Sequence, residues 1–188
     1  MIFNKTPLAG LYEIELEKRQ DERGFFARFF CVNEYKDRSL ENKIVQINNS
    51  FTLKKHTLRG LHYQVPPKAE ERIVRCLRGS ILDMSLDLRP KSPTFGKWHS
   101  VKLTSDNRKM IYIPKGFAHG FMTLEDDTEI LYLVTELYSP EHERVIRWDD
   151  PAFGMKWPEK PKDISKKDSE QSDFDPEFHL KGMETIKI

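Results

Sequence analysis

The sequence has few cysteines, and they are not spaced for chemistry. Its 188 residues include two cysteines, Cys31 and Cys76, which can form at most one disulfide. Neither belongs to a C-x-x-C pair of the kind found in zinc and redox sites. We interpret both as buried thiols, because free cysteine is among the residue types most often found in protein interiors.

The sequence also lacks long apolar runs and an excess of either charge. The longest apolar run, 130–134, is far shorter than the ~18 residues that span a bilayer. Residues 1–16 contain no apolar stretch followed by a cleavage site, so we expect a cytoplasmic protein. With 31 Lys+Arg against 30 Asp+Glu, the formal net charge is +1. Nucleic-acid-binding surfaces show a basic excess, so neither a nucleic acid nor a membrane is expected as a partner.

The length predicts one domain, residues 1–188, at roughly 150 residues per domain. After Pro158 the composition becomes rich in Lys, Asp, Ser and Glu. We therefore divide the domain into a core of about residues 1–160 and a C-terminal segment, 161–188, that either wraps the surface or is partly disordered. Phe174 and Phe178 are its candidate anchors.

Short β-rich segments separated by turn residues occupy residues 44–148. In segment 81–88, leucine and methionine alternate with Asp83, Ser85 and Asp87, which predicts a strand with one buried face. The turn-like segment 78–80 before it predicts a hairpin with residues 72–77. A second hairpin is expected at 129–138, after the turn-like segment 125–128. Further strands are predicted at 45–52, 58–64, 98–103, 110–113 and 120–124.

Helical periodicity is confined to residues 32–42. Without long amphipathic helices to form crossovers, a parallel α/β sheet is not expected. The sequence therefore predicts a mainly β fold, an antiparallel jelly roll or β-barrel with short helices.

Three strand-like segments carry unusual polar residues, at 45–50, 57–64 and 113–121. In the first, Gln46, Asn48 and Ser50 share one face. That face either lines a cavity or is the solvated face of an antiparallel strand. In the second, Arg59 falls on the face opposite to His62 unless a bulge at Gly60 disturbs the ladder.

The histidines raise the question of a metal. The spacing from Pro114 through Gly116 to His119 resembles the second half of the cupin metal signature, whose first half supplies His-x-His and then Glu. The corresponding segment, 61–64, contains His62 alone. With two imidazoles and no thiolate or clear carboxylate to complete a ligand set, we expect no metal.

Acid–base chemistry needs a base, an acid on the opposite side of the substrate, and a group that orients the base. His62 is the natural candidate base, because imidazoles in general change protonation near neutral pH. Tyr132 places a phenol in the apolar run 130–134, where its hydroxyl requires a partner or a substrate. The alternative is a core tyrosine bonded to the backbone.

Several short motifs occur in order between about residues 3 and 170. They are 21–26 (DERGFF), 58–64 (LRGLHYQ), 74–76 (VRC), 87–89 (DLR), 92–96 (SPTFG), 113–121 (IPKGFAHGF), Tyr138, 148–151 (WDDP) and 164–168 (ISKKD). In this order and spacing, they closely resemble the dTDP-4-dehydrorhamnose 3,5-epimerase family.

The resemblance implies a cupin-type jelly roll, usually dimeric, that uses neither metal nor other cofactor. Its substrate would be a nucleotide-linked 4-keto-6-deoxyhexose, and its reaction the conversion of dTDP-4-dehydro-6-deoxy-D-glucose to dTDP-4-dehydro-L-rhamnose. A C4 ketone acidifies the hydrogens on C3 and C5, so a base can remove each one and an acid on the other face can return it with inversion. By motif position, His62 would be the base, Asp168 its orienting carboxylate and Tyr132 the opposing acid.

The resemblance also implies a set of substrate-binding residues. They are Arg23, Phe26, Gln46, Asn48, Arg59, Arg72, His119, Tyr138 and Glu143. Tyr138 would stack on the base, with Glu143 nearby. Arg23 and Phe26 would reach into the pocket of the neighbouring subunit of a homodimer.

Two positions depart from the family pattern. Arg72 stands where many members have lysine, and Arg28 where several have a glutamate that meets the thymine ring. A guanidinium is broader than an ammonium and donates from a fixed plane. The alternatives are therefore an epimerase acting at one centre, an epimerase of another nucleotide-linked 4-keto sugar, and a non-catalytic sugar-nucleotide-binding protein.

Overall fold

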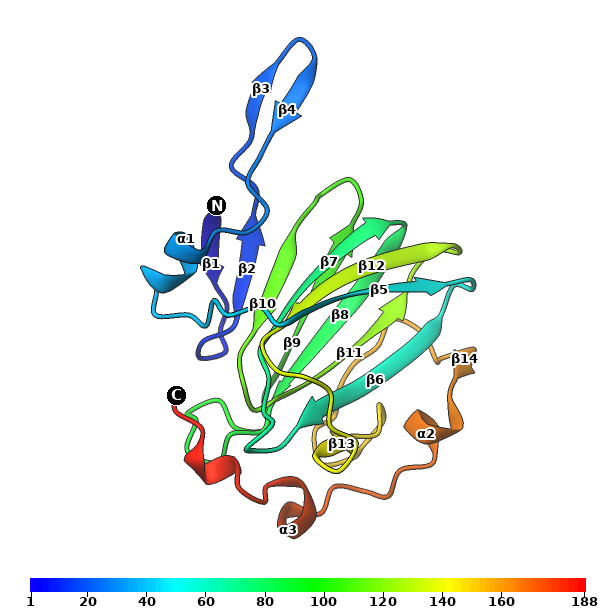
Figure 1. Ribbon diagram of the computed structural model, residues 1–188. Coiled ribbons are helices and arrows are strands. Elements are labelled where there is room, and N and C mark those ends of the chain that lie inside the picture. The colour runs from blue at the N-terminus through cyan, green and yellow to red at the C-terminus, as the bar shows by residue number, and fades with distance from the viewer.

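Two antiparallel β-sheets face one another in the computed structural model, which describes residues 1–188 (Figure 1). The first sheet has the order β1 (Ile2–Lys5), β2 (Tyr12–Glu15), β10 (Met110–Ile113), β7 (Arg72–Arg78), β12 (Thr128–Val134) and β5 (Gln46–Thr52). The second has the order β13 (Glu143–Val145), β6 (Thr57–Gln64), β11 (Phe117–Thr123), β8 (Ser80–Asp87) and β9 (Trp98–Thr104). The predicted mainly β, antiparallel fold is confirmed.

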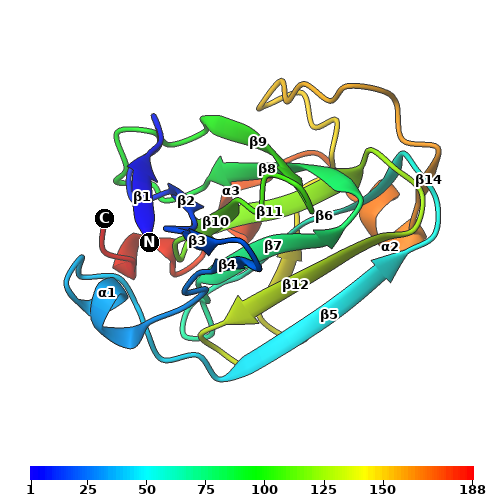
Figure 2. The same cartoon turned by 90° about the horizontal axis from the view of Figure 1, so that it is seen from above.

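Both predicted hairpins are wrong, because the chain changes sheet at the turns. At Gly79, which has a φ of +74°, the chain passes from β7 in the first sheet to β8 in the second. The turn before residue 129 likewise joins β11 of the second sheet to β12 of the first, where β12 pairs with β5 and β7. Figure 2 shows β5, β12 and β7 on one side of the molecule and β8, β9 and β11 on the other. Local turn residues identify a reversal but not the sheet that the next strand joins.

Strand β8 is buried on both faces, which corrects the prediction of one buried face. Asp83, Ser85 and Asp87 are fully buried. On the other face, leucine and methionine side chains of β8 pack against C-terminal residues that include Trp157 and Phe174. The aliphatic face therefore lies under the C-terminal segment. The polar residues lie on the opposite face of β8 together with Ile81, whose side chain packs in the core between the two sheets.

An aliphatic and aromatic core lies between the sheets. It includes Val74 and Ile130 from the first sheet and Ile81 and Phe121 from the second. Each such side chain contributes roughly 1.5–3 kcal/mol when it is fully removed from water. This packing holds the two sheets at a fixed separation.

The N-terminal region contains a hairpin that the sequence did not predict. Strands β3 (Arg19–Asp21) and β4 (Gly24–Phe26) are exposed along their whole length and project from the body of the molecule (Figure 1). Helix α1 (Val32–Lys36) is shorter than the predicted 32–42 and buries Tyr35. Both cysteines are free thiols, of which Cys76 is buried and Cys31 half-buried.

The C-terminal segment wraps the second sheet. It forms β14 (Asp163–Ile164), α2 (Lys166–Ser169), α3 (Pro176–His179) and a 3₁₀ turn (Met183–Thr185). The buried His179 is 2.8 Å from the hydroxyl of Tyr63, and its ring stacks on Phe174. Phe174 is thus an anchor, whereas Phe178 is half exposed. None of the helices combines the length and apolar character needed to cross a bilayer.

Candidate active site

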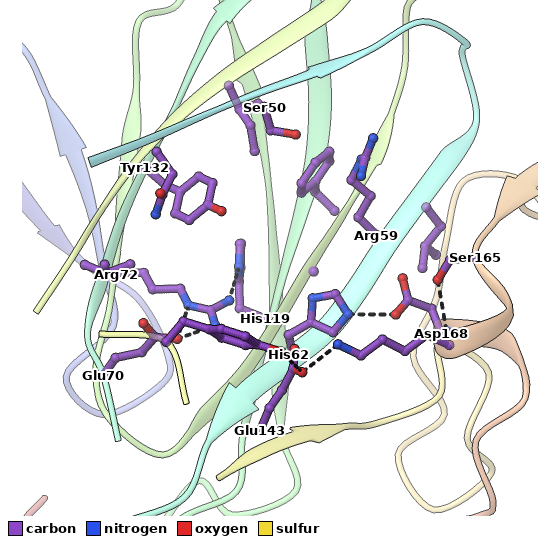
Figure 3. A pocket seen from close by; sticks show the side chains of 18 of the residues that line it. Ser50, Arg59, His62, Glu70, Arg72, His119, Tyr132, Glu143, Ser165 and Asp168 are labelled. Atoms are coloured by element: carbon purple, nitrogen blue, oxygen red, sulfur yellow. Dashed lines mark hydrogen bonds and ion pairs between the residues drawn. The ribbon is translucent and has the colours of Figure 1, made fainter. Parts of the chain in front are cut away.

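A cavity of about 700 Å³ opens between the two sheets (Figure 3). Strands β5, β7 and β12 line one wall, and β6, β11 and the start of the C-terminal segment line the other. It brings together ten of the twelve predicted site residues, namely Gln46, Asn48, Arg59, His62, Arg72, His119, Tyr132, Tyr138, Glu143 and Asp168. Arg23 and Phe26 are not among its lining residues.

His62 and Asp168 form a hydrogen-bonded pair at one end of the cavity (Figure 3). Nε2 of His62 lies 2.7 Å from Oδ1 of Asp168, and the other carboxylate oxygen accepts from the Gly60 backbone N–H at 3.2 Å. Burial acts to raise the pKa of Asp168, but the bond to His62 and the other donors outweigh it and lower that pKa. Asp168 is therefore held as a carboxylate that accepts from the imidazole.

The local sequence explains how Asp168 is placed. Ser165 is the N-cap of α2, and its hydroxyl accepts from the Asp168 backbone N–H at 3.1 Å. Residue 164, just before the cap, pairs with Leu58 of β6 in a parallel register. A strand contact followed at once by a capped helical turn thus holds the carboxylate against His62.

Gly60 allows Arg59 and His62 to share the cavity. The register between β6 and β11 shifts at this point, between His119 and Phe121. Gly60 has a φ of +115°, and a Cβ there would lie 2.6 Å from Cα of Gly120. Only glycine fits this close approach without strain. The irregularity anticipated at Gly60 is confirmed.

Tyr132 projects into the cavity from β12, on the wall opposite to His62 (Figure 3). Its hydroxyl makes no hydrogen bond to another protein group, unlike the buried phenols of Tyr63 and Tyr112. The predicted alternative, a core tyrosine bonded to the backbone, is therefore not what the fold contains. A phenol facing a polar cavity is available to a ligand.

The polar stripe of β5 lies along the same wall. Gln46, Asn48 and Ser50 all line the cavity, and Nε2 of Gln46 donates to Oδ1 of Asn48 at 2.6 Å. Arg59, from the other wall, donates from Nε to the hydroxyl of Thr52 at 3.1 Å. It has no carboxylate partner, so its remaining N–H groups can meet an anion.

Arg72 belongs to a chain of charged contacts across the cavity floor (Figure 3). Its Nε and NH2 donate to one oxygen of Glu70, at 3.1 and 2.5 Å. Its NH1 lies 3.4 Å from Nδ1 of His119, whose Nε2 lies 2.8 Å from Oδ2 of Asp83. Arginine has no acceptor, so Nδ1 of His119 must accept and Nε2 must carry the proton.

Tyr138 and Glu143 meet at the cavity mouth. The Tyr138 hydroxyl donates to Oε2 of Glu143 at 2.8 Å, and Nζ of Lys167 donates to the same oxygen at 2.5 Å. Burial acts to raise the pKa of Glu143, but these donors outweigh it and lower that pKa. The Tyr138 ring is mostly exposed, which leaves a flat aromatic surface at the entrance.

Arg23 and Phe26 lie on the projecting β3–β4 hairpin. The Arg23 guanidinium donates to Asp21 on the same hairpin at 2.6 Å, and both Arg23 and Phe26 are strongly exposed. Arg28, just beyond β4, donates to Glu34 at 2.7 Å. Within one chain, therefore, the hairpin contributes nothing to its own cavity.

Sequence reasoning missed several residues of the cavity. Glu70 and Lys167 carry charges in polar segments and show no pattern of their own. Asp83 alternates with apolar residues, which made it resemble a solvated position, yet it is fully buried beneath His119. Alternation alone shows which residues share a face of β8 but not which of the two faces is turned toward the other sheet.

No group of three or more His, Cys, Asp or Glu side chains lies close enough together to hold a metal ion. The two histidines of the cavity are each engaged by a carboxylate, Asp168 for His62 and Asp83 for His119. The chemistry that this chain's own side chains offer here is proton transfer and anion binding.

The two facing sheets form a cupin-type jelly roll, and its cavity holds a histidine–carboxylate pair opposite a phenol that bonds to no other protein group. The profile of the dTDP-4-dehydrorhamnose 3,5-epimerase family matches residues 5–175. The chain belongs to this family.

The similarity extends over most of the chain. The dTDP-4-dehydrorhamnose 3,5-epimerase of Sinorhizobium fredii is 42% identical over 91% of this chain and 88% of its own length. The crystal structure of the enzyme of that name from Elizabethkingia anophelis superposes with a TM-score of 0.89 at 34% identity, covering 93% and 96% of the two chains. The dTDP-6-deoxy-D-glucose-3,5-epimerase of Legionella pneumophila, solved in complex with dTDP-4-keto-L-rhamnose, has a TM-score of 0.81 at 38% identity, with 89% of each chain covered.

Proposed function

We propose that this protein epimerises C3 and C5 of a nucleotide-linked 4-keto-6-deoxyhexose, converting dTDP-4-dehydro-6-deoxy-D-glucose to dTDP-4-dehydro-L-rhamnose. The observation that carries the proposal is the His62–Asp168 pair facing Tyr132 across one cavity. Family membership supports the substrate class. The geometry supports the reaction type, because a base and an acid on opposite walls are what inversion at carbon requires.

The reaction proceeds by two rounds of proton transfer. Unprotonated His62 removes the hydrogen from the carbon beside the ketone, and the electron pair moves to the C4 oxygen to give an enolate. Tyr132 then donates its hydroxyl proton to the other face of the same carbon, and the ketone re-forms. Solvent returns a proton to the phenolate and takes one from the imidazolium before the second carbon reacts.

Asp168 supports the imidazolium that forms in each round. Its carboxylate accepts from Nε2, so Nδ1 is the nitrogen that faces the substrate and takes the proton. A fixed negative charge 2.7 Å away stabilises the positive ring without itself becoming protonated. Asp168 is thus a positioning residue, whereas His62 and Tyr132 contact the reacting carbons.

The remaining cavity residues bind the substrate. Arg59 is the cavity cation without a carboxylate partner and would contact the diphosphate. Arg72 and the Gln46–Asn48 stripe would contact the sugar, with His119 behind Arg72. Tyr138 would stack on the nucleobase, held by its bond to Glu143.

The charge of the cavity supports a contribution from a second copy of the chain. Its lining holds three cations, Arg59, Arg72 and Lys167, and five carboxylates, Glu70, Glu136, Glu143, Asp163 and Asp168. A diphosphate is poorly matched to such a lining. We therefore propose a homodimer in which Arg23 and Phe26 of one copy, on the projecting hairpin, reach the cavity of the other.

The outer face of β5 supports the same assembly. Ile47 and Phe51 point outward from this edge strand and are 60% and 47% exposed. Edge strands with exposed apolar side chains are prone to pair with another chain. A second copy of the chain would cover this face, and a second copy is also what the projecting hairpin needs in order to reach a cavity. A dimer mass in light scattering, lost when Ile47 and Phe51 are replaced by Lys, is expected.

Incubation of the protein with dTDP-4-keto-6-deoxyglucose in D₂O tests the proposed reaction. Deuterium at both C3 and C5, with inversion of both centres in the NMR spectrum, is the expected result. Label at one carbon alone would instead assign a single-centre epimerase. No exchange above the enzyme-free rate, although dTDP binds, would identify a binding protein or an enzyme for another nucleotide sugar.

A further inference from the structure

The Arg72 guanidinium is held from two sides inside the cavity. Its side chain is 16% exposed and that of Glu70 is 10% exposed. Nε–H and one NH2 hydrogen point to Glu70, and one NH1 hydrogen points to Nδ1 of His119. Of the five N–H groups of an arginine, two therefore remain for a ligand, and their direction is set by the other three.

The contact with Glu70 differs in kind from the other ion pairs of the cavity. A flexible ammonium can turn its donors freely, but a guanidinium donates only in its own plane. Glu70 receives two adjacent donors of that plane, which fixes both its tilt and its rotation. Removing the carboxylate leaves the plane free to rotate about the side chain.

His119 completes the arrangement. Asp83 accepts from Nε2 of His119, so the ring presents Nδ1 as an acceptor to Arg72. Both ring nitrogens are thus engaged within the protein. His119 has no free donor for a ligand, so its contribution passes through Arg72.

We infer that Glu70 is a positioning residue that aims Arg72 at the ketone oxygen of the substrate. The substrate part of this inference rests on the proposed function. As negative charge develops on the C4 oxygen, the two free N–H groups of Arg72 stabilise it only if they are aligned beforehand.

The kinetic test is a double-mutant cycle. Glu70→Gln keeps the shape of the side chain and replaces the two charge-assisted hydrogen bonds to Arg72 with weaker neutral ones, so the guanidinium is held less firmly. The substitution is expected to lower kcat about tenfold and leave KM within about threefold, because misaligned donors weaken transition-state binding more than substrate binding. In the Arg72→Lys background there is no planar guanidinium for residue 70 to orient. The same change at residue 70 should therefore alter kcat by less than about threefold. Equal effects in both backgrounds, or no effect in either, would overturn the inference.

Glu71→Gln is the matched control. Glu71 is the next residue, but its carboxylate binds the Tyr112 hydroxyl outside the cavity. It should leave kcat and KM unchanged. Melting curves of all variants show whether a loss of kcat comes from misalignment or from unfolding. If Glu70→Gln unfolds, Glu70→Asp takes its place in the comparison. Glu70→Asp keeps the charge but shortens the side chain, so a smaller loss in kcat is expected.

A ligand-free measurement separates this inference from the proposed function. In ¹⁵N NMR of the unsubstituted protein, the Nε–H of Arg72 is expected to exchange slowly with solvent, because it donates to Glu70 inside the cavity. Glu70→Gln should speed this exchange roughly tenfold, because a neutral acceptor holds the donor more weakly, and Glu71→Gln should leave it unchanged. If Glu70→Gln speeds the exchange while the protein fails to turn over the keto sugar, only the proposed function falls. If turnover is normal and neither the exchange of Arg72 Nε–H nor kcat responds to Glu70→Gln, only the inference falls.

Discussion

Nε2 of His62 and Oδ1 of Asp168 lie 2.7 Å apart although the two residues are 106 positions apart in the chain. The contact depends on the start of the C-terminal segment, which pairs with β6 and then forms a capped turn beside it. The base and its carboxylate are thus supplied by two different parts of the fold. Activity should therefore depend on how this segment is held.

Replacing Asp168 with Asn should lower kcat roughly hundredfold or more, because the amide can hold the wrong imidazole tautomer and cannot stabilise the imidazolium. Deuterium exchange into the keto sugar measures the loss. Asp173→Asn is the control, since that carboxylate is in the same segment but pairs with Arg147 outside the cavity. Equal losses in both variants would show that the segment, rather than the carboxylate, matters.

Replacing Tyr132 with Phe should separate exchange from inversion. His62 can still remove and return a proton on its own face, so solvent deuterium should enter with the configuration retained. Inversion should fall at least about hundredfold, because the opposing acid is gone. The melting temperature should not change, since the hydroxyl bonds to no protein group. Inversion at the unsubstituted rate would exclude Tyr132 as the acid.

The sequence predicted parts of the site in two ways, by the alternation of polar and apolar residues within strands and by the resemblance of its motifs to a family. Alternation within β5 placed Gln46, Asn48 and Ser50 on one face, and they do line one wall. The motif resemblance was needed for Asp168, because a lone carboxylate in a Lys-rich segment looks solvated. Local patterns could not predict the sheet changes at Gly79 and after β11, since non-local pairing decides them.

Glu70 and Asp83 mark the limit of pattern reasoning in the site. Asp83 lies on the face of β8 that is turned to the interior between the sheets, where it binds His119, while the C-terminal segment covers the opposite, aliphatic face. Glu70 binds Arg72 only two residues away, but a role in the site follows only because Arg72 also meets His119 of β11. The contacts of Arg72 and Asp83 with His119 join segments that are far apart in the sequence.

Lowering the pH should loosen the C-terminal segment through His179. Burial, the strongest influence, lowers the pKa of His179 below 6.5, while Asp150 and Asp175 act to raise it and Arg144 to lower it. Because the folded state favours the neutral ring, this stabilisation is complete above pH 6.5 and is lost as the pH falls through the lowered pKa.

Hydrogen exchange of residues 170–188 at about pH 7.5 and about pH 5 measures this effect. Protection corrected for the intrinsic exchange rate should fall at the lower pH. In His179→Phe, which keeps an aromatic ring beside Phe174 but cannot titrate, it should not. The same pH response in both proteins would contradict the role of His179.

Two inactive variants should complement one another if the hairpin crosses between subunits. In a mixed dimer of His62→Ala and Arg23→Ala, one cavity carries both defects and the other carries none. Co-expression should restore about a quarter of the unsubstituted activity, as expected for random pairing of symmetric subunits. Mixing His62→Ala with Asp168→Asn, two defects of one cavity wall, is the control and should restore none. Absence of recovery in the first mixture would place Arg23 outside the partner's cavity.

Deuterium exchange by His62→Ala tests the central claim most directly. The account predicts that the folded variant still binds dTDP but that exchange at both C3 and C5 falls at least about hundredfold, toward the enzyme-free rate. Exchange at the unsubstituted rate in this variant would contradict the account, because another group would then be the base.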